Sequence, residues 1–430
     1  MSDYLKNITP DSFSGLIFAL EGIDRTIVLL NGPTGCKFYH SAISDNQTIK
    51  QFEFDPLNYP QKWYFGQPRV PCTYLDSSDY VYGSQEKLVE ALSFLQDNVP
   101  FELLCVVNSP GAALIGDDLR GIVSQVIKEK PFVVIETPGF SSDICKGYEM
   151  AAIELLKQLQ LSPTEERLPA TVNILGLSIY HRNHAGDIAE LTRLMGLCDI
   201  SVNCFLCADC DLESIAAIPK AELNIVIHPE YGLKTARFLQ AQFGTPYYVC
   251  DGPPIGFSAT EKLMHDLCHS LNRDSSRFQS ESEKARARAY VHISRVNSLT
   301  GLPQGVNFAL EGTCSELYAY TTFLVRHFGM VLECAAVLNE QSNCFKEKLF
   351  ELLSSLGLED ALERDILQAS SELVFASGNT IAQLKSRQHV FVGVEVSLPS
   401  IGYVDVIPKT HLGIQGALML TEQIINGLLF

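Results

Sequence analysis

The sequence predicts an α/β protein of three doubly wound, Rossmann-like lobes with mainly parallel sheets. Short apolar runs alternate with segments whose apolar residues recur every three to four positions, which is β-α-β-α order. The chain has 430 residues, too many for one hydrophobic core. Two polar stretches, residues 161–169 and 272–283, interrupt the alternation. We therefore predict lobes at residues 1–165, 166–280 and 281–430, the last with a C-terminal helix.

The predicted strands are apolar runs bounded by turn residues. In chain order they cover residues 27–30, 103–107, 132–135, 172–179, 199–205, 223–227, 247–250, 305–310, 331–337, 373–376 and 390–394. Helical spacing is seen in residues 84–96 and 234–243, and a further helix is expected over residues 284–296. Ligands of such sheets bind beyond the carboxyl ends of the strands. The loops that follow strands are therefore the places to search for chemistry.

Composition and charge exclude several classes of protein. The chain is 46% hydrophobic and 19% charged, which is typical of a globular protein. With 32 basic and 50 acidic residues its formal net charge is −18. A nucleic-acid partner is not expected, because binding to phosphates needs a basic surface. Solubility alone also explains the acidity.

Thirteen cysteines are many for a chain in which no export signal is recognised. The N-terminus has no basic region followed by an apolar core, so we expect no signal peptide. No apolar run is long enough to cross a membrane. We therefore predict a cytoplasmic protein whose cysteines are free thiols or metal ligands rather than disulfides.

Three loops of the first lobe carry candidate ligands. Cys36 follows a predicted strand and the turn Gly-Pro-Thr-Gly, and Cys72 stands next to a proline ahead of a helix. The third loop contains Ser109 and ends in Gly-Asp-Asp at Asp118, a turn that can cap the next helix or hold the loop. Two cysteines on neighbouring loops fit half of an iron–sulfur cluster. They also fit ordinary buried cysteines, so the residues alone leave both interpretations open.

These loops resemble component 1 of the nitrogenase superfamily, which includes nitrogenase catalytic subunits, cofactor-assembly scaffolds, and dark protochlorophyllide and nickel-tetrapyrrole reductases. The family pattern is Gly-Pro-x-Gly-Cys, then a cysteine before an acidic, glycine-containing helix start, then a cysteine before Ile-Gly-Asp-Asp. Cys36 and Cys72 match the first two parts, and Asp118 ends the third. Asn-Ser-Pro-Gly, with Ser109, stands where the third cysteine is expected. Further matches cover residues 221–232, 243–247, 397–403 and 412–417, the last two resembling β-type subunits.

The missing third cysteine affects the cluster that the resemblance implies. An eight-iron P-cluster takes three cysteines from each of two subunits, whereas this chain offers Cys36 and Cys72. A four-iron cluster shared across a subunit interface fits better, either in a homodimer or in a heterotetramer with a homologous subunit. Ser109 is a candidate oxygen ligand, although a helix-cap or turn serine is the favoured interpretation.

The family resemblance also implies a catalytic pocket between the lobes. Nitrogenase holds its active-site metal cluster there with one cysteine and one histidine. His228 aligns with the cysteine. Leu412 aligns with the histidine, and the adjacent His411 is a candidate cofactor ligand. The standard pair is therefore absent. His228 is predicted to ligate a metal or to donate a proton near neutral pH, and a polar loop histidine is the structural alternative.

Two further groups are considered. Cys204, Cys207 and Cys210 have a ferredoxin-like spacing, but Cys204 is expected to face the core and no fourth cysteine follows, so we favour buried thiols. His181 and His184 follow the first strand of the second lobe, where an exposed loop is favoured over a pocket role. No Gly-x4-Gly-Lys-Ser/Thr motif is present, so the chain is not expected to bind ATP itself.

The resulting hypothesis is a subunit of a nitrogenase-like reductase. The resemblance implies that a separate ATP-hydrolysing iron–sulfur protein supplies low-potential electrons. They would pass through the interface cluster to a substrate, a second metal cofactor or a tetrapyrrole between the lobes. Two rival roles remain open, a scaffold for cofactor assembly and a non-catalytic β-type partner of a paralogous chain.

Overall fold

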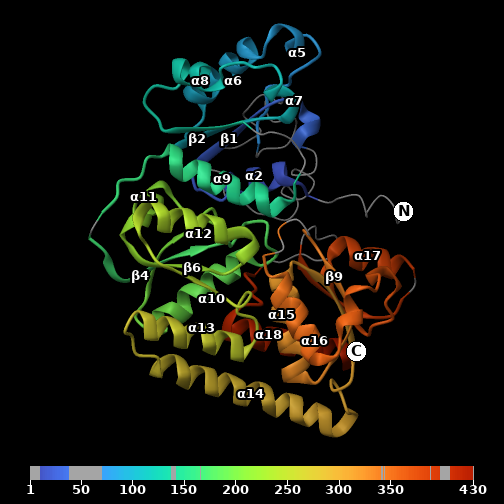
Figure 1. Ribbon diagram of the computed structural model, residues 1–430. Helices are drawn as coiled ribbons and strands as arrows, with labels where there is room; N and C mark the ends of the chain where they lie inside the picture. The colour runs from blue at the N-terminus through green and yellow to red at the C-terminus, as the bar shows by residue number, and fades with distance from the viewer. Residues whose placement is uncertain are drawn as a thin grey trace.

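Three separate parallel sheets form the framework of the protein (Figure 1). The computed structural model describes residues 10–37, 70–136, 142–164, 166–339, 342, 344–387, 389–397 and 407–429. In Figure 1 the first lobe, blue to cyan, lies above the second and third lobes, green and orange, which lie side by side. Every strand pair in the described ranges is parallel. This confirms the predicted fold class, while the lobe boundaries stay a prediction.

The first sheet has the order β1-β2-β3 and helices on both faces. Leu29 of β1 and Val106 of β2 pack against α6 and α8, whereas Leu30 and Cys105 pack against α2 and α9. Successive side chains of a strand point to opposite faces, so one apolar run supplies both layers. The elements of this lobe are α2 (Ser12–Glu21), β1 (Thr26–Asn31), η1 (Thr34–Lys37), α5 (Asp79–Tyr82), α6 (Gln85–Asn98), β2 (Leu103–Asn108), α7 (Pro110–Ala113), α8 (Leu119–Val126), β3 (Phe132–Glu136) and α9 (Ile144–Gln158).

The second sheet has the order β5-β4-β6-β7, and a long helix follows it. Its elements are β4 (Leu168–Leu175), α10 (His184–Leu197), β5 (Ser201–Phe205), α11 (Leu212–Ala216), η3 (Ile218–Lys220), β6 (Ala221–Val226), α12 (Pro229–Phe243), β7 (Tyr247–Val249), α13 (Phe257–Ser270) and α14 (Ser276–Thr300). Helix α14 begins eight residues before the predicted helix. Buried Phe278, Ser282, Ala285 and Ala289 at helical spacing explain the early start of a stretch whose polar composition suggested a linker.

The third sheet has the order β11-β10-β8-β9. Its elements are β8 (Asn307–Gly312), α15 (Cys314–Phe328), β9 (Val331–Val337), α16 (Lys346–Leu356), η5 (Glu359–Leu362), η6 (Ile366–Gln368), β10 (Leu373–Ser377), α17 (Gly378–Ser386), β11 (Val392–Ser397) and α18 (Gly413–Leu429). The predicted C-terminal helix is α18. The family-like stretch just before it lies outside the described residues between 398 and 406.

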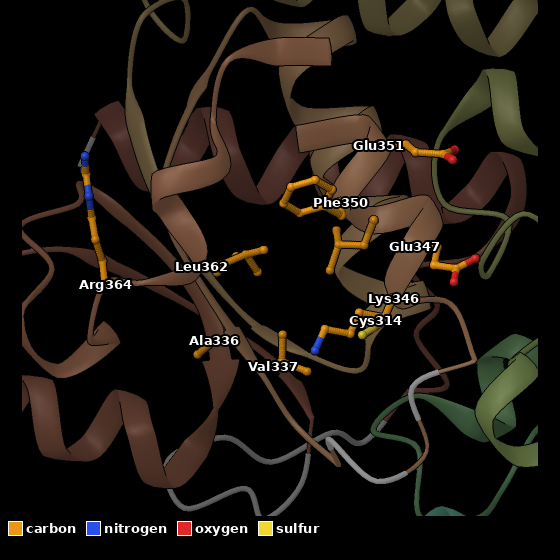
Figure 2. Close-up of a pocket in the computed structure, with 11 residues that line it drawn as sticks. Cys314, Ala336, Val337, Lys346, Glu347, Phe350, Glu351, Leu362 and Arg364 are labelled. Atoms are coloured by element: carbon orange, nitrogen blue, oxygen red, sulfur yellow. The ribbon is translucent and has the colours of Figure 1, made fainter. Parts of the chain in front are cut away.

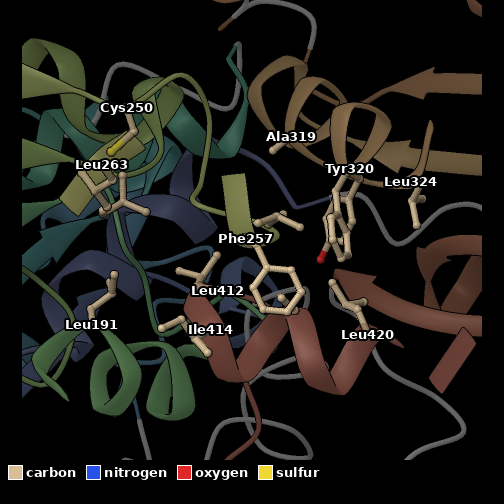
Figure 3. Packing of buried hydrophobic residues seen from close by; sticks show 14 of the residues in the cluster. Leu191, Cys250, Phe257, Leu263, Ala319, Tyr320, Leu324, Leu412, Ile414 and Leu420 are labelled. Atoms are coloured by element: carbon tan, nitrogen blue, oxygen red, sulfur yellow. The ribbon is translucent and has the colours of Figure 1, made fainter. Parts of the chain in front are cut away.

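One hydrophobic core joins the second and third lobes. It includes Leu191 of α10, Phe257 of α13, Tyr320 of α15 and Leu420 of α18, and Figure 3 shows these side chains around the start of α18. Helix α18 packs on α10, α13, α14 and β11. The two lobes are therefore held at a fixed relative position, which matters for any site built between them. None of the helices within the described ranges combines the length and apolar character that a membrane crossing requires.

Candidate functional site

A buried polar network lies beneath the three loops of the first lobe. The side-chain amide of Asn31, at the end of β1, donates to Asn108 at 2.9 Å and to the Ser84 hydroxyl at 3.1 Å. The hydroxyl of Thr73 donates to the Asn31 amide oxygen at 2.9 Å. All four residues are buried. Breaking any of these hydrogen bonds would leave a buried polar group unsatisfied, so the network fixes the loops relative to one another.

The Gly-Asp-Asp turn holds helices in this lobe. Asp117 accepts hydrogen bonds from the backbone N–H and the hydroxyl of Ser84, both at 2.7 Å. Asp118 caps α8 by accepting from the N–H of Gly121 at 2.9 Å. Both functions expected of this turn, capping a helix and holding a loop, are therefore confirmed.

Cys36 and Cys72 occupy neighbouring segments at the carboxyl end of β1. Cys72 forms an isolated parallel bridge with Leu30, and Cys36 lies in η1 directly after the strand. Cys36 is half-buried and Cys72 is fully buried. Burial is the main cause that raises the pKa of the Cys36 thiol above its ordinary value, so a metal would have to displace its proton. We call Cys36, Cys72 and Ser109 the thiol site.

Ser109 acts as a helix cap next to Cys36. It directly precedes α7, and its Oγ accepts a hydrogen bond from the N–H of Ala112 at 3.2 Å. Ser109 opposes the burial-driven rise in the pKa of both the Cys36 thiol and the Tyr80 hydroxyl. The capping geometry agrees with the favoured interpretation of this serine. A role as oxygen ligand of a metal stays a prediction.

Gly32 allows the loops of the thiol site to approach closely. A Cβ atom at this position would lie 2.5 Å from the Ser109 Oγ and 2.6 Å from the Ser109 Cβ. Gly35, three residues later in the same turn, has no atom of the described residues within 4 Å of the corresponding position. The two glycines of the Gly-Pro-Thr-Gly turn therefore differ, since only Gly32 is needed for packing against Ser109.

A second site lies where the second and third lobes meet. His228 precedes α12 at the end of the β6 segment, and its ring contacts that of His181, with centroids 4.1 Å apart and ring planes tilted by 32°. Glu316, in the first turn of α15, places its Oε1 atom 3.9 Å from the His228 Nδ1. One ligand atom from each residue lies within 4.8 Å of the others. We call His181, His228 and Glu316 the imidazole site. His181 lies at this site rather than on an exposed loop, which corrects the sequence-based interpretation.

Burial changes the protonation expected for this site. Desolvation lowers the pKa of His228 to about 3 and that of His181 well below its ordinary value. Desolvation also raises the pKa of Glu316. Both imidazoles are therefore neutral at pH 7, so His228 is not a protonated donor near neutral pH. A neutral imidazole remains able to bind a metal or to donate one N–H hydrogen bond.

His411 is buried and has a structural partner. Its Nδ1 lies 2.7 Å from the Tyr320 hydroxyl, and Tyr320 follows Glu316 by four residues on α15, one helical turn away. Asp187 fixes the same loop by accepting from the Thr410 hydroxyl at 2.7 Å. Burial is the main cause that raises the pKa of Asp187 to about 7. Helix α15 thus contacts His228 and His411 through successive turns, while His411 is not one of the three close ligand residues.

Comparisons with known proteins identify the family. The pattern of the nitrogenase component 1 type oxidoreductases matches residues 12–429. The chain therefore belongs to the nitrogenase component 1 type oxidoreductases. The named relatives and solved structures that it resembles support this assignment.

Two named relatives have different roles. The B subunit of the light-independent protochlorophyllide reductase of Acidiphilium rubrum is 24% identical over 374 residues, 84% of this chain and 72% of that protein. The nitrogenase iron-molybdenum cofactor biosynthesis protein NifE of Methanosarcina barkeri is 25% identical over 327 residues, 71% of this chain and 63% of that protein. The solved structure titled "Nitrogenase Cp1 at pH 6.5" has the same fold, with a TM-score of 0.74 at 16% identity, covering 97% of this chain and 91% of that chain.

The ferredoxin-like cysteines of this family member are core residues. Cys204, Cys207 and Cys210 are all buried, and the N–H of Cys207 donates to the Cys210 Sγ at 3.3 Å. Cys204 belongs to a hydrophobic cluster that also contains Cys105. Within the described part of the chain, these thiols do not form a group of three close ligand atoms. The arrangement agrees with the favoured interpretation of buried thiols.

The third lobe contains a cavity of about 790 Å³ that the sequence did not reveal. It lies between β9, α16 and the start of α15, and Figure 2 shows Lys346 directed toward Val337 and Cys314 at one side of it. Arg364 stands on the opposite side. Its lining residues all come from the third lobe, so it is distinct from the imidazole site.

Two residues of the imidazole site were missed or undervalued in the sequence. Glu316 belongs to a Thr-x-x-Glu capping box at the start of α15, and only tertiary structure shows that one of its oxygens faces His228. His181 was recognised as following a strand of the second lobe. Its position after β4, next to the β6 strand in the sheet, is the signal that favours a pocket role.

Proposed function

We propose that this chain is a subunit of a nitrogenase-like reductase. It receives low-potential electrons from a separate ATP-hydrolysing iron–sulfur protein and passes them to a substrate or metal cofactor between the lobes. The observation that carries the proposal is the joint placement of Cys36 and Cys72 at the end of β1. These are two soft thiol ligands on loops that a buried hydrogen-bond network holds in place.

The thiol site fits half of an iron–sulfur cluster. Two thiols meet half of the four-cysteine requirement of a [4Fe–4S] cluster, so a second subunit must supply the rest. Cys36 and Cys72 would hold the cluster, which when bound supplies one-electron transfer. Surrounding apolar residues such as Leu30 and Val70 limit solvent access, and burial is one of the factors that set a cluster potential. A homodimer or a heterotetramer with a homologous subunit both satisfy this ligand count.

The same proposal places the reacting group next to His228, between the second and third lobes. The structural basis is the convergence of His181, His228 and Glu316 from loops at the carboxyl ends of two sheets. A tetrapyrrole is one substrate class to test, since a protochlorophyllide reductase subunit is among the relatives.

A cofactor-assembly scaffold is the second candidate function. The replacement of the expected cofactor-binding cysteine by His228 favours it, as does the likeness to a NifE protein. A scaffold holds a cofactor without turning over substrate, so the two functions differ in catalysis but not in cluster content.

Anaerobic purification with iron and sulfide analysis tests the thiol site. The native chain is expected to be brown and to contain about two irons per subunit, half of a shared four-iron cluster. Cys36→Ala and Cys72→Ala should each lose this iron. Cys105→Ala is the matched control, because Cys105 is a buried cysteine of the neighbouring strand β2. Iron that stays together with acid-labile sulfide in the Cys36→Ala, Cys72→Ala double variant would overturn the proposal.

A further inference from the structure

Three ligand atoms of different residues converge in the imidazole site. His181, His228 and Glu316 come from the loop after β4, the residue before α12 and the first turn of α15. One nitrogen or oxygen atom from each lies within 4.8 Å of the other two. Across the described part of the chain, no other group of three histidine, cysteine, aspartate or glutamate residues is this close. Two imidazoles and one carboxylate are a ligand set that first-row divalent metals use.

The backbone around the site positions His181 and His228 next to each other. Gly176 has φ +84°, and a Cβ there would lie 2.5 Å from the carbonyl oxygen of His228. Gly232 approaches the same segment, since its Cβ would lie 2.9 Å from the Gly176 nitrogen. Absence of side chains at both positions lets the loop after β4 reach the start of α12. The ring contact between His181 and His228 follows from this close approach.

Hydrogen bonds orient the side chains of His181 and Glu316 in the site. The Ser178 N–H donates to the His181 Nδ1 at 3.1 Å, which directs the His181 Nε2 elsewhere. Thr313 donates to Glu316 Oε2 through its N–H at 2.8 Å and its hydroxyl at 2.9 Å. The other oxygen, Oε1, is the atom near His228. Glu316 is therefore held through one oxygen while the other remains for a ligand. His181 accepts at Nδ1 and so carries its proton on Nε2, which becomes a ligand atom when that proton moves to Nδ1.

Within the part of the chain that the structure describes, two buried nitrogen atoms of the site have no hydrogen-bond partner. These are the His181 Nε2 and the His228 Nδ1. A buried polar atom without a partner is rare in folded proteins and calls for an explanation such as an ion or a water molecule. We propose that His181 Nε2, His228 Nδ1 and Glu316 Oε1 bind one divalent first-row metal ion, Fe²⁺ or Zn²⁺.

The geometry needs only small side-chain movements to hold the ion. Ligands at the usual 2.0–2.2 Å from a metal are separated by about 3 to 3.6 Å, compared with 3.9 Å between His228 Nδ1 and Glu316 Oε1. Binding at the His181 Nε2 moves the imidazole proton to Nδ1, so the contact from Ser178 must be given up. Three protein ligands leave at least one coordination position for substrate, as in catalytic metal sites.

This inference rests on the pocket that the proposed function places between the lobes, and its test is separate from the thiol site. The full chain with Cys36→Ala and Cys72→Ala is stripped with a chelator and titrated anaerobically with Co²⁺. Visible d–d bands report nitrogen and oxygen ligation, and charge-transfer bands in the near ultraviolet report thiolate ligation. We expect one Co²⁺ per chain with d–d bands and without thiolate bands.

Variants of the three ligands then identify the site. His228→Ala and Glu316→Gln should weaken Co²⁺ binding by more than the roughly 10- to 100-fold loss seen when an outer-shell partner is removed. His265→Ala is the control, since that histidine is 72% exposed and lies outside the site. Circular dichroism checks folding, and Glu316→Gln carries the test if a histidine variant unfolds, because glutamine can still accept from Thr313.

Three results would overturn the inference. They are no Co²⁺ binding by the parent chain, bands of thiolate ligation only, or unchanged affinity in both Glu316→Gln and His228→Ala. A chain that holds cluster iron but no Co²⁺ refutes the metal site alone. A chain that binds Co²⁺ here but never holds a cluster refutes the proposed function alone.

Discussion

The thiol site and the imidazole site are built in the same way, but they differ in the number of ligand atoms that this chain supplies. Both lie on loops beyond the carboxyl ends of parallel strands. The thiol site offers two cysteines, Cys36 and Cys72, held by a network of neutral hydrogen bonds around Asn31. The imidazole site offers three ligand atoms from one chain. Under the two proposals, the first site would need ligands from a partner subunit, whereas the three ligand atoms of the second come together once the second and third lobes have packed.

The largest expected effect is a loss of catalytic rate that comes from a change at the imidazole site and leaves the thiol site intact. In an assay of ATP-dependent substrate reduction, with a tetrapyrrole as the first substrate class to test, His228→Gln should lower the rate by more than the roughly 10- to 100-fold loss seen when an outer-shell partner of a metal ligand is removed. The physical reason is that glutamine keeps size and hydrogen bonding but loses the imidazole. Iron content at Cys36 and Cys72 should stay unchanged. Wild-type rates in the variant would make His228 structural, and lost iron would show that the two sites are not independent.

Gly32→Ala should disrupt the thiol site, because its new Cβ would collide with Ser109. We expect a loss of about 1 to 3 kcal/mol in the free energy of unfolding, the usual effect of overpacking, together with reduced iron content. Gly35→Ala is the matched control within the same turn, with no atom of the described residues within 4 Å, and should stay within about 0.5 kcal/mol. Equal effects in both variants would refute the role given to Gly32.

The loop that carries His411 should add a pH dependence to stability. Burial raises the pKa of Asp187 to about 7, above its value of about 3.9 in an unfolded chain. Between these values the folded state holds the proton and the unfolded state does not, so stability decreases as pH rises. Glu190 also raises this pKa, while the Thr410 hydroxyl and the backbone at His411 and Leu412 oppose the shift.

Asp187→Asn tests this effect. Compared with the variant, the native chain should lose about 2 kcal/mol more of its free energy of unfolding between pH 5 and pH 7. Urea denaturation at the two pH values measures the difference. Parallel pH profiles for the two chains would contradict a buried, proton-holding Asp187.

The smallest expected effect concerns Ser109. Ser109→Ala removes the cap of α7 and should lower the free energy of unfolding by about 1 kcal/mol. The iron content should remain, because Ser109 is interpreted as a cap rather than a ligand. Thermal denaturation and iron analysis check both statements. Loss of iron together with a near-native unfolding free energy would instead identify Ser109 as a ligand.

The local pattern of apolar residues was sufficient to predict which strands form, but not where all of them begin and end. Every predicted strand corresponds to a strand of the structure. The strand predicted at residues 172–179 corresponds to β4, which ends earlier, at Leu175. It ends there because Gly176 takes a left-handed backbone conformation. The start of α14 was missed, because its exposed polar face resembles a linker in composition.

The residues of the two candidate sites could likewise be predicted only in part from the sequence. Sequence motifs located Cys36, Cys72 and His228 in loops after strands. They did not show that His181 and Glu316 meet at His228, since those contacts depend on how two lobes pack. They also did not reveal the neutral state of His228, because its lowered pKa results from burial that tertiary structure creates. Residue type and spacing predict candidate ligands, whereas convergence and protonation are properties of the folded chain.

The most direct test of the central claim is ATP-dependent electron transfer into the chain. The anaerobic protein is mixed with the iron–sulfur protein of a light-independent protochlorophyllide reductase, with dithionite, and with or without MgATP, and cluster absorbance is followed. We predict bleaching that requires MgATP and is absent in the Cys36→Ala, Cys72→Ala variant. A native chain that contains its cluster, assembled with its partner subunit, but shows no MgATP-dependent reduction would contradict a reductase and favour the scaffold.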